Sequence, residues 1–201
     1  YVTNFKKKDK IKKKYKKKLD FYIRHTKFII KTVKNLKLKN KKICSMQIRN
    51  VPHFGHEAVF RFILDKFDLL VLNPIFGIKK KKDFENKIIT KSLKFMERKY
   101  KKIKFLPFWT NFYYGGPREA LHHLSMREQL GFKYFYIGRD HAGAENIFNP
   151  DAATKIVKIH KNKFKIKSIT SSGGYFCKKC KKYLIKGSCK HKNLINISGT
   201  E

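Results

Sequence analysis

Acidic residues are scarce in this 201-residue chain, which has 14 Asp and Glu residues against 50 Lys and Arg residues and a formal net charge of +36. A charge of this size attracts nucleic acids, anionic membranes and other polyanions. The lysines, however, are spread through every expected helix, strand and loop and are not confined to one face or one tail. We therefore interpret the charge as a bias of composition and do not expect nucleic acid to be the main partner.

Long hydrophobic runs are also missing, so we expect no membrane-spanning helix and no membrane partner. The first residue is Tyr1 rather than Met, which indicates a fragment or a processed product, and residues 6–18 are too rich in lysine for a signal peptide. There are only four cysteines, three of them clustered near the end, a pattern that suits metal binding in a reducing compartment better than disulfides. We expect a cytoplasmic protein.

What is present suffices for one or two folded domains, because 41% of the residues are hydrophobic and 14% are aromatic. Residues 5–20 carry Ile11, Tyr15 and Leu19 among lysines, which fits either a basic amphipathic helix or a solvated, partly frayed segment. We favour the second interpretation. Residues 21–38 contain enough apolar positions to pack as a helix ahead of the first strand.

A strand, a loop and a helix follow one another around residue 50. Residues 42–46 are apolar enough for a short buried strand, and residues 57–67 carry apolar side chains on a broad helical face. Residues 68–74 then form a continuous apolar run closed by Asn73 and Pro74, which is typical of a strand buried on both faces. This order predicts a parallel βαβ unit with a right-handed crossover.

The later segments continue the alternation of strands and helices. We predict helices over residues 84–100, 117–130 and 151–160, and strands over residues 103–108, 132–137 and 164–169, with breaks at Pro107 and Gly131. Such alternation is typical of an α/β fold with a parallel sheet. Ligands of these folds lie at the carboxyl ends of the strands.

A first polar cluster falls at such a strand end. Gln47 and Arg49 alternate along the end of the first strand. His53 and His56 stand at the entry to the next helix, and Gly55 allows a ligand to approach the backbone. Helix N-terminal amides, a guanidinium fork and imidazoles together suit phosphate or sulfate. The alternative is that these are polar residues of a loop and an edge strand.

A second polar cluster follows the strand expected at residues 132–137. It reads Gly138, Arg139, Asp140, His141, Ala142 and Gly143. Because the carboxyl ends of parallel strands share one edge, we expect it to lie beside the first cluster. The alternative interpretation is a charged turn.

The three clustered cysteines belong to a C-x-x-C pair and a C-x-H pair, formed by Cys177 and Cys180 and by Cys189 and His191. Three thiolates and an imidazole are the ligands of a closed, structural zinc site. No histidine follows His191, so a histidine ligand from the tail can only be this one. Reduced surface cysteines are the alternative, and Cys44 is expected in the core.

Residues 47–57 read Q-I-R-N-V-P-H-F-G-H-E and resemble the Q-T-R-N-P-x-H-x-x-H signature of the ATP sulfurylase family, within the larger H-x-G-H group of nucleotidyltransferases. The G-R-D-H-A-G string of residues 138–143 resembles a second signature of the family. Weaker matches are G-G-P-R-E-A-L at residues 115–121, the loop of residues 77–83 and the I-S-G-T string at residues 197–200. Two departures are Ile48, where the family usually has Thr, and Phe54, where a basic residue is common.

The resemblance implies a Rossmann-like nucleotidyltransferase domain with a parallel sheet and a small zinc-binding insertion. It implies transfer of AMP from ATP to sulfate, giving adenosine 5′-phosphosulfate and pyrophosphate, or the reverse reaction, within sulfur metabolism and sulfate assimilation. The implied partners are ATP and sulfate, with Mg²⁺ arriving on ATP, a structural Zn²⁺ and a homo-oligomer when full length.

By resemblance, the catalytic residues are Arg49, Asn50, His53 and His56. The substrate-binding residues are Gln47, Arg49, Gly138, Arg139, Asp140, His141 and Ala142. Sulfate has no proton to remove at neutral pH, so such a site needs positioning and charge neutralisation and no general base. Three points stay outside this assignment: Arg118 and the loop of residues 77–83 are either surface groups or part of the site, and His122 and His123 are expected to be packing or surface residues.

The expected division is a basic N-terminal segment with a lead-in helix at 1–41, a catalytic domain at 42–170 and a zinc-binding segment with a clipped C-terminal end at 171–201. Two other functions also fit the sequence. One is an H-x-G-H nucleotidyltransferase with a different acceptor, which product analysis without sulfate would reveal. The other is a basic nucleic-acid-binding protein with a zinc ribbon, which salt-dependent oligonucleotide binding would reveal.

Overall fold

The computed structural model describes residues 13–39, 42–77, 79–80, 83–139, 141 and 147–197. Its centre is a five-stranded sheet in which every strand runs parallel to its neighbours. The strand order is β4-β2-β1-β6-β7, with β1 (Ile43–Met46), β2 (Leu69–Leu72), β4 (Ile103–Phe105), β6 (Tyr134–Ile137) and β7 (Lys167–Thr170). The predicted α/β fold with a parallel sheet is confirmed.

The chain winds outward from β1 to β2 and β4 and then returns to the other side of β1 for β6 and β7. Strands β1 and β6 are therefore neighbours, with Cys44 opposite Tyr134 and Met46 opposite Tyr136. In open α/β sheets the ligand crevice lies where the winding reverses, outside the carboxyl ends of the two strands. Both polar clusters follow directly from these two strand ends.

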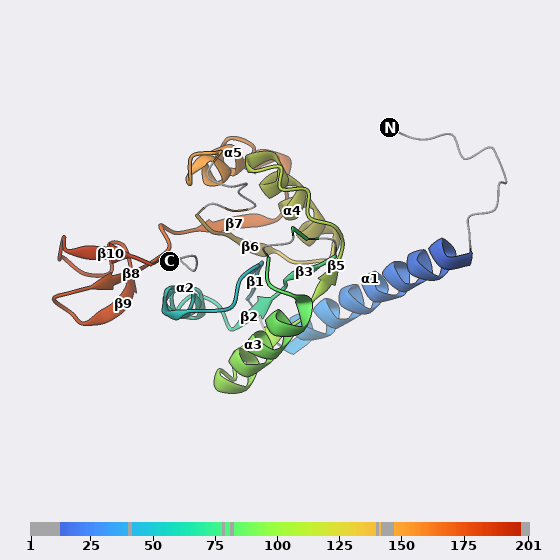
Figure 1. The fold of residues 1–201 in the computed structure, drawn as a ribbon, viewed down its shortest axis with the longest axis horizontal. Helices are drawn as coiled ribbons and strands as arrows, with labels where there is room; N and C mark the ends of the chain where they lie inside the picture. Colours follow the sequence, from blue (N-terminus) through green and yellow to red (C-terminus); the bar gives the residue numbers. More distant parts are fainter. Residues whose placement is uncertain are drawn as a thin grey trace.

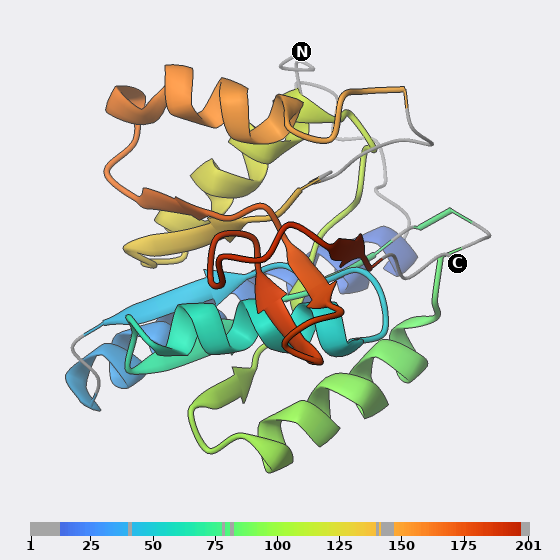
Figure 2. The same cartoon turned by 90° about the vertical axis from the view of Figure 1, so that its left-hand side faces the viewer.

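Helices cover both faces of the sheet (Figure 2). One face carries α2 (Phe54–Leu64) and α3 (Asn86–Lys99), and the other carries α4 (Pro117–Gln129) and α5 (Ala152–Ile159), which the short η1 turn (Lys161–Lys163) follows. Leu70 and Leu72 point into the first core, whereas Leu69 and Val71 point into the second. Burial on both faces explains why β2 is a continuous apolar run.

Two prolines interrupt neighbouring strands at the same level. Beyond Pro74 and Pro107 the parallel pairing resumes in β3 (Ile75–Phe76) and β5 (Phe108–Trp109). The predicted break at Pro107 is confirmed, because proline has no N–H to donate to the ladder.

The fully buried guanidinium of Arg127 donates to the Asn73 carbonyl at 2.9 Å, and burial lowers the pKa of Arg127 to about 9.

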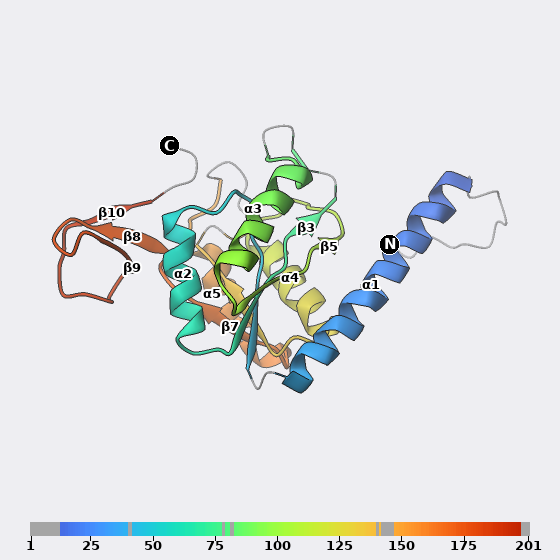
Figure 3. The same cartoon turned by 90° about the horizontal axis from the view of Figure 1, so that it is seen from below.

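The expectation of a frayed segment before residue 21 is wrong for its described part. Residues from Lys13 onward belong to α1 (Lys13–Lys39), one continuous helix, and residues 5–12 lie outside the described residues. Its second half packs Ile29 and Val33 into the core, while its first half extends beyond the body (Figures 1 and 3). Once one half of a helix is anchored by packing, it propagates readily into lysine-rich sequence, because Lys is a good helix former.

None of the described helices has the length and apolar character needed to cross a membrane.

A separate antiparallel ribbon packs on α2 (Figure 1). It has the strand order β10-β8-β9, with β8 (Gly174–Cys177), β9 (Lys182–Ile185) and β10 (Leu194–Asn196). The ring of Phe54 stacks on Tyr183 with centroids 4.6 Å apart, so this departure from the family motif contacts the ribbon. We expected Gly55 to leave room for a ligand, but the Gly174 backbone occupies the space beside it: a β-carbon on Gly174 would lie 2.3 Å from the Gly55 carbonyl oxygen.

Replacing Gly174 with Ala should loosen the ribbon from α2, because the added methyl group would overlap the Gly55 backbone. We expect urea denaturation to show a loss of unfolding free energy of about 1–3 kcal/mol, the usual cost of overpacking. Gly115→Ala is the matched control, since its methyl group would meet the Glu119 side chain at an ordinary 3.7 Å. Equal stability of the two variants would contradict the packing contact.

Candidate functional site

The first polar cluster is built around the start of α2. His53 is the N-cap residue, and its Nδ1 accepts a hydrogen bond from the Gly55 backbone N–H at 3.1 Å. Nδ1 of His56 in turn accepts from the backbone N–H of His53 at 3.4 Å. Two imidazoles thus take the places of the hydroxyl and carboxylate of an ordinary capping box. The helix consequently begins at Phe54 rather than at residue 57, where we predicted its start.

These two histidines are neutral hydrogen-bond donors. Burial lowers the pKa of His53 below its usual range, and burial together with the charge of His53 lowers the pKa of His56 to about 3. Because each Nδ1 accepts an N–H group, the single proton of each neutral ring is on Nε2. The ring centroids are 4.1 Å apart, so two donors stand together at the positive end of a helix dipole, where an anion is favoured.

Residues 47–50 leave the end of β1 and keep the predicted alternation. Gln47 and Arg49 are half-buried, whereas Ile48 between them is buried in the core, so this second departure from the family motif is a packing residue. Asn50 is half-buried beside them. Oε1 of Gln47 is buried and has no hydrogen-bond partner within the described part of the chain. A half-turn of the amide exchanges its oxygen and nitrogen, so this end can accept from or donate to a ligand.

Tyr114 connects Arg49 with the basic loop of residues 77–83, although no motif singled it out. Its hydroxyl donates to Asp83 at 2.5 Å and accepts the Lys80 backbone N–H at 2.9 Å. The Arg49 guanidinium carbon is 5.8 Å from the centre of the tyrosine ring, and Lys80 Nζ is 4.6 Å from it. The φ of Tyr114 is 54°, a conformation that costs free energy for a residue with a side chain. Of the two interpretations of this loop, the contacts favour the one in which it forms part of the site.

The second polar cluster follows β6. Gly138 and Arg139 are half-buried, and Arg139 donates to the hydroxyl of Tyr175 on β8 at 3.2 Å. Asp140 and Ala142 lie outside the described residues. The ribbon therefore has two contacts with the rest of the protein: it packs on α2, and it meets the second polar cluster at the edge of the sheet.

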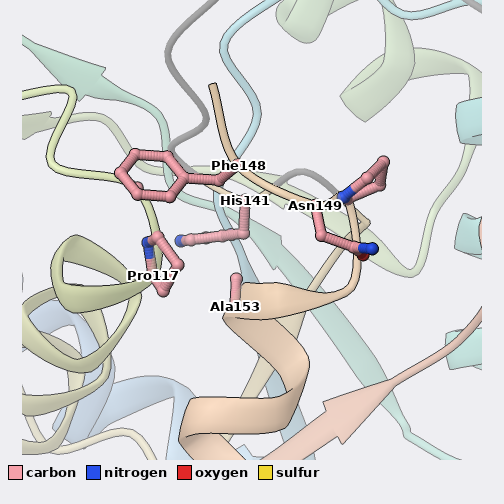
Figure 4. A pocket seen from close by; sticks show the side chains of 7 residues that line it. Pro117, His141, Phe148, Asn149 and Ala153 are labelled. Carbon is pink, nitrogen blue, oxygen red and sulfur yellow. The ribbon is translucent and has the colours of Figure 1, made fainter. Parts of the chain in front are cut away.

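His141 is the buried member of the second cluster. Its pKa is held well below the usual range, first by burial and then by the neighbouring His123 ring and the charges of Arg127 and Arg49. A small hollow lies beside its ring (Figure 4). The other lining residues are Gly116, Pro117, Phe148, Asn149, Pro150 and Ala153. The two clusters follow the paired strands β1 and β6 and so leave the sheet at the same edge.

His123 contacts the second cluster, which we did not predict. We expected His122 and His123 to be packing or surface residues, and His122 is exposed whereas His123 is fully buried and hydrogen-bonded to His141. Its other ring nitrogen lies 3.1 Å from the carboxylate of Glu119, one helical turn earlier. The i, i+4 spacing of these two residues was the available signal, but spacing does not reveal which helical face is buried. Arg118, whose role was open, is exposed in the first turn of α4.

The four predicted metal ligands come together on the ribbon. The ligand atoms of Cys177, Cys180, Cys189 and His191 all lie within 4.8 Å of one another. Sγ of Cys177 is 3.8 Å from Sγ of Cys189, and Sγ of Cys180 is 3.2 Å from Nδ1 of His191. Thiolates bound tetrahedrally at about 2.3 Å from one ion would be about 3.8 Å apart. The cluster can therefore hold a metal ion, whereas Cys44 is buried in the core as expected.

Residues 24–201 match the family model described as ATP-sulfurylase. A sulfate adenylyltransferase of Ignicoccus hospitalis is 37% identical over 166 residues, which is 80% of this chain and 43% of that protein. One of Pyrococcus abyssi is 36% identical over 169 residues, covering 80% of this chain and 44% of that protein. The chain thus spans less than half the length of these curated relatives.

The fold is also similar to that of a solved hexameric APS kinase from Thiobacillus denitrificans. The TM-score is 0.61 at 12% sequence identity, and the likeness covers 86% of this chain and 33% of the other. At this identity the likeness shows the fold alone.

Buried neutral histidines should make this fold sensitive to acid. The pKa values of His56, His123 and His141 lie below the 6.5 of an unfolded histidine, so below that pH the unfolded chain binds protons that the folded protein does not. Unfolding free energy should therefore fall as the pH is lowered from about 6.5 to 5, as measured by urea titration at several pH values. His123→Asn should reduce this slope, and His122→Asn, at an exposed neighbour, should not. A stability that does not change over this range would contradict the neutral buried state.

Removing one ligand of the metal cluster should release the ion. For protein purified under reducing conditions, we expect elemental analysis to find about one metal ion per chain, as a closed tetrahedral site would hold. The Cys189→Ser protein should contain none. Cys44→Ser is the control, because its thiol is far from the cluster in sequence, buried in the core and has a raised pKa through burial. Metal-free wild-type protein would exclude the site.

Proposed function

The chain belongs to the ATP-sulfurylase family, and we propose that its described part is the catalytic core of a sulfate adenylyltransferase. In this reaction a sulfate oxygen attacks the α-phosphorus of ATP and the bond to pyrophosphate breaks. The products are adenosine 5′-phosphosulfate and pyrophosphate, and the reverse direction forms ATP. The proposal also places the full-length protein in the cytoplasm as a homo-oligomer that acts in sulfate assimilation.

The observation that carries the proposal is the meeting of both polar clusters at the edge where β1 and β6 end. Gln47 and Arg49 come from one strand end, and Arg139 and His141 come from the other. A reaction between two mutually repelling anions needs groups that hold both of them in contact and neutralise their charge. This edge supplies guanidinium groups, neutral N–H donors and a helix N-terminus in one place.

The residue roles follow from the chemistry of each group. Arg49 binds sulfate through its planar fork, and the amide of Gln47, whose Oε1 has no partner among the described residues, supplies a further hydrogen bond. By resemblance the backbone N–H of Ala142, which lies outside the described residues, completes this subsite. The Nε2–H groups of His53 and His56 donate to phosphate oxygens and stabilise the departing pyrophosphate. Neutral donors suit this task because they need no change of protonation during turnover.

Five further residues complete the proposed site. Asn50 acts beside Arg49 as the other motif residue at the reacting phosphate. Gly138, Arg139 and Asp140 line the nucleotide subsite together with His141. These assignments rest on the family motifs and on the position of the described members at the strand ends.

Magnesium enters this site with ATP rather than on a carboxylate cage of the protein. The described carboxylates near the site already have partners: Asp83 accepts from Tyr114, Glu57 from Lys99, and Glu119 from backbone N–H groups. An ion that keeps several waters and binds through substrate phosphates needs no such cage. Its role is to neutralise phosphate charge when the nucleotide binds.

We assign zinc to the cluster of three cysteines and His191, as a structural ion. Four protein ligands leave no open coordination position for a substrate. The ion would hold the ribbon together, and the ribbon contacts the active site at α2 and at Arg139. This supports a division into a lead-in segment at 1–41, a catalytic domain at 42–170 and a zinc-binding segment at 171–201.

Arg49→Ala should abolish most of the activity, since loss of one pre-organised donor commonly costs about 10²- to 10³-fold in rate. The assay is ATP formation from adenosine 5′-phosphosulfate and pyrophosphate, the thermodynamically easy direction. We expect His53→Ala and His56→Ala to lose at least as much. Because both histidines cap α2, the folding of these two variants must be verified by circular dichroism.

Arg98→Ala, at an exposed position on α3, is the matched control and should retain full activity. Near-normal turnover by the Arg49→Ala protein would remove sulfate from this pocket. Pyrophosphate release from ATP in the absence of sulfate would indicate a nucleotidyltransferase with another acceptor. The assay should be repeated on the full-length protein, because the chain spans 43% of the first relative's length.

A further inference from the structure

Glu119, His123 and His141 form a buried row from the first turn of α4 to the second polar cluster. Nε2 of His123 faces Oε1 of Glu119 at 3.1 Å, and Nδ1 of His123 is 3.0 Å from Nε2 of His141. All three side chains are buried, and His123 is fully so. The same carboxylate accepts the backbone N–H groups of Tyr113 at 3.0 Å and of Gly115 at 2.7 Å. A row of polar groups buried at this depth has few alternative hydrogen-bond arrangements.

The positions of the protons in this row follow from the charge state of Glu119, which stands at one end. Burial alone would raise the pKa of Glu119, but the close His123 ring and hydrogen bonds from two backbone N–H groups bring it below the usual value. Glu119 is therefore ionised and can only accept. A ring nitrogen without a proton would be repelled at 3.1 Å from this carboxylate, so Nε2 of His123 carries one, although its N–H approaches the oxygen obliquely.

The second proton is fixed by the first. Burial lowers the pKa of His123 to about 4, so the ring is neutral near pH 7 and its Nδ1 is an acceptor. The proton in the bond between the two rings then belongs to Nε2 of His141. His141 is neutral as well, because burial and the charges of Arg127 and Arg49 disfavour a second proton. Nδ1 of His141 is left as a bare acceptor.

We propose that Glu119 and His123 are positioning residues that present His141 to the nucleotide as a hydrogen-bond acceptor. A bare nitrogen repels phosphate or sulfate oxygens, so it selects a donor, which on an adenylate is the base amino group or a ribose hydroxyl. His53 and His56 have the opposite polarity, since each uses Nδ1 within the cap and keeps its proton on Nε2. The site thus separates donor histidines for the anions from an acceptor histidine for the nucleoside. This inference rests on the proposed function for the identity of the ligand, but its proton arrangement does not.

The arrangement is tested first without any substrate. In protein labelled with ¹⁵N-histidine, long-range imidazole correlation spectra near pH 7 should show His141 protonated on Nε2 and bare on Nδ1, with its signals assigned from a His141→Gln sample. His123→Leu removes the acceptor for that proton and should change the His141 pattern. A His141 that carries a proton on Nδ1 in the wild-type protein would overturn the proposal.

The functional consequence is tested with three variants at adjacent positions. His123→Leu should raise KM for adenosine 5′-phosphosulfate on the order of 10-fold, the worth of one hydrogen bond, with a smaller effect on kcat. His123→Asn, whose amide oxygen can replace Nδ1 as the acceptor, should restore most of the wild-type value. His122→Leu, at the exposed neighbour, should behave as wild type.

Equal KM values for the His123→Leu and His122→Leu proteins would overturn the positioning role, and failure of His123→Asn to rescue KM in a folded protein would do the same. Absence of ATP formation in the wild-type, full-length protein would instead overturn the proposed function. The spectra separate the two cases, because they report the His141 tautomer whether or not the protein turns over.

Discussion

The parallel pairing of β1 with β6 is the constraint on which the rest of this site depends. It joins residues 44–46 to residues 134–136, which lie far apart in the chain, and so brings the segments that follow them to one edge of the sheet. The flanking crossovers leave toward opposite ends of the sheet, which opens the ligand crevice at this edge. Arg49, His53 and His56 come from one side of the pairing, and Arg139 and His141 from the other.

Control of protonation is the second theme of the structure. A chain of net charge +36 does not need more positive charge at an anion site; it needs hydrogen bonds of fixed direction. Burial keeps His56, His123 and His141 neutral. We infer that the proton position on each ring is set by its neighbour: a backbone amide for His56, the Glu119 carboxylate for His123 and the His123 ring for His141. Because these rings are buried, losing one of their hydrogen bonds would cost more free energy than at the surface, so the arrangement is rigid.

The ribbon couples the metal cluster to the edge of the sheet. Phe54 stacks on Tyr183, Gly174 lies against the Gly55 backbone, and Arg139 bonds to Tyr175. These contacts involve the first turn of α2 and the residue after Gly138, which are both parts of the proposed active site. An ion bound by the cysteine cluster would therefore influence the geometry of the proposed active site through packing.

Local pattern was enough to predict the parallel sheet, the start of α4 at Pro117, the break at Pro107 and the cluster of three cysteines and His191 that could hold a metal ion, because each depends on neighbours close in sequence. The roles of the motif residues at the strand ends stay predictions. Only the tertiary structure decided the continuity of α1, the contact of Gly55 with Gly174, the strained Tyr114 bridge and the row from Glu119 to His141. Each of these depends on which face of an element is covered by a segment far away in the chain, and residue spacing within one element does not contain that information.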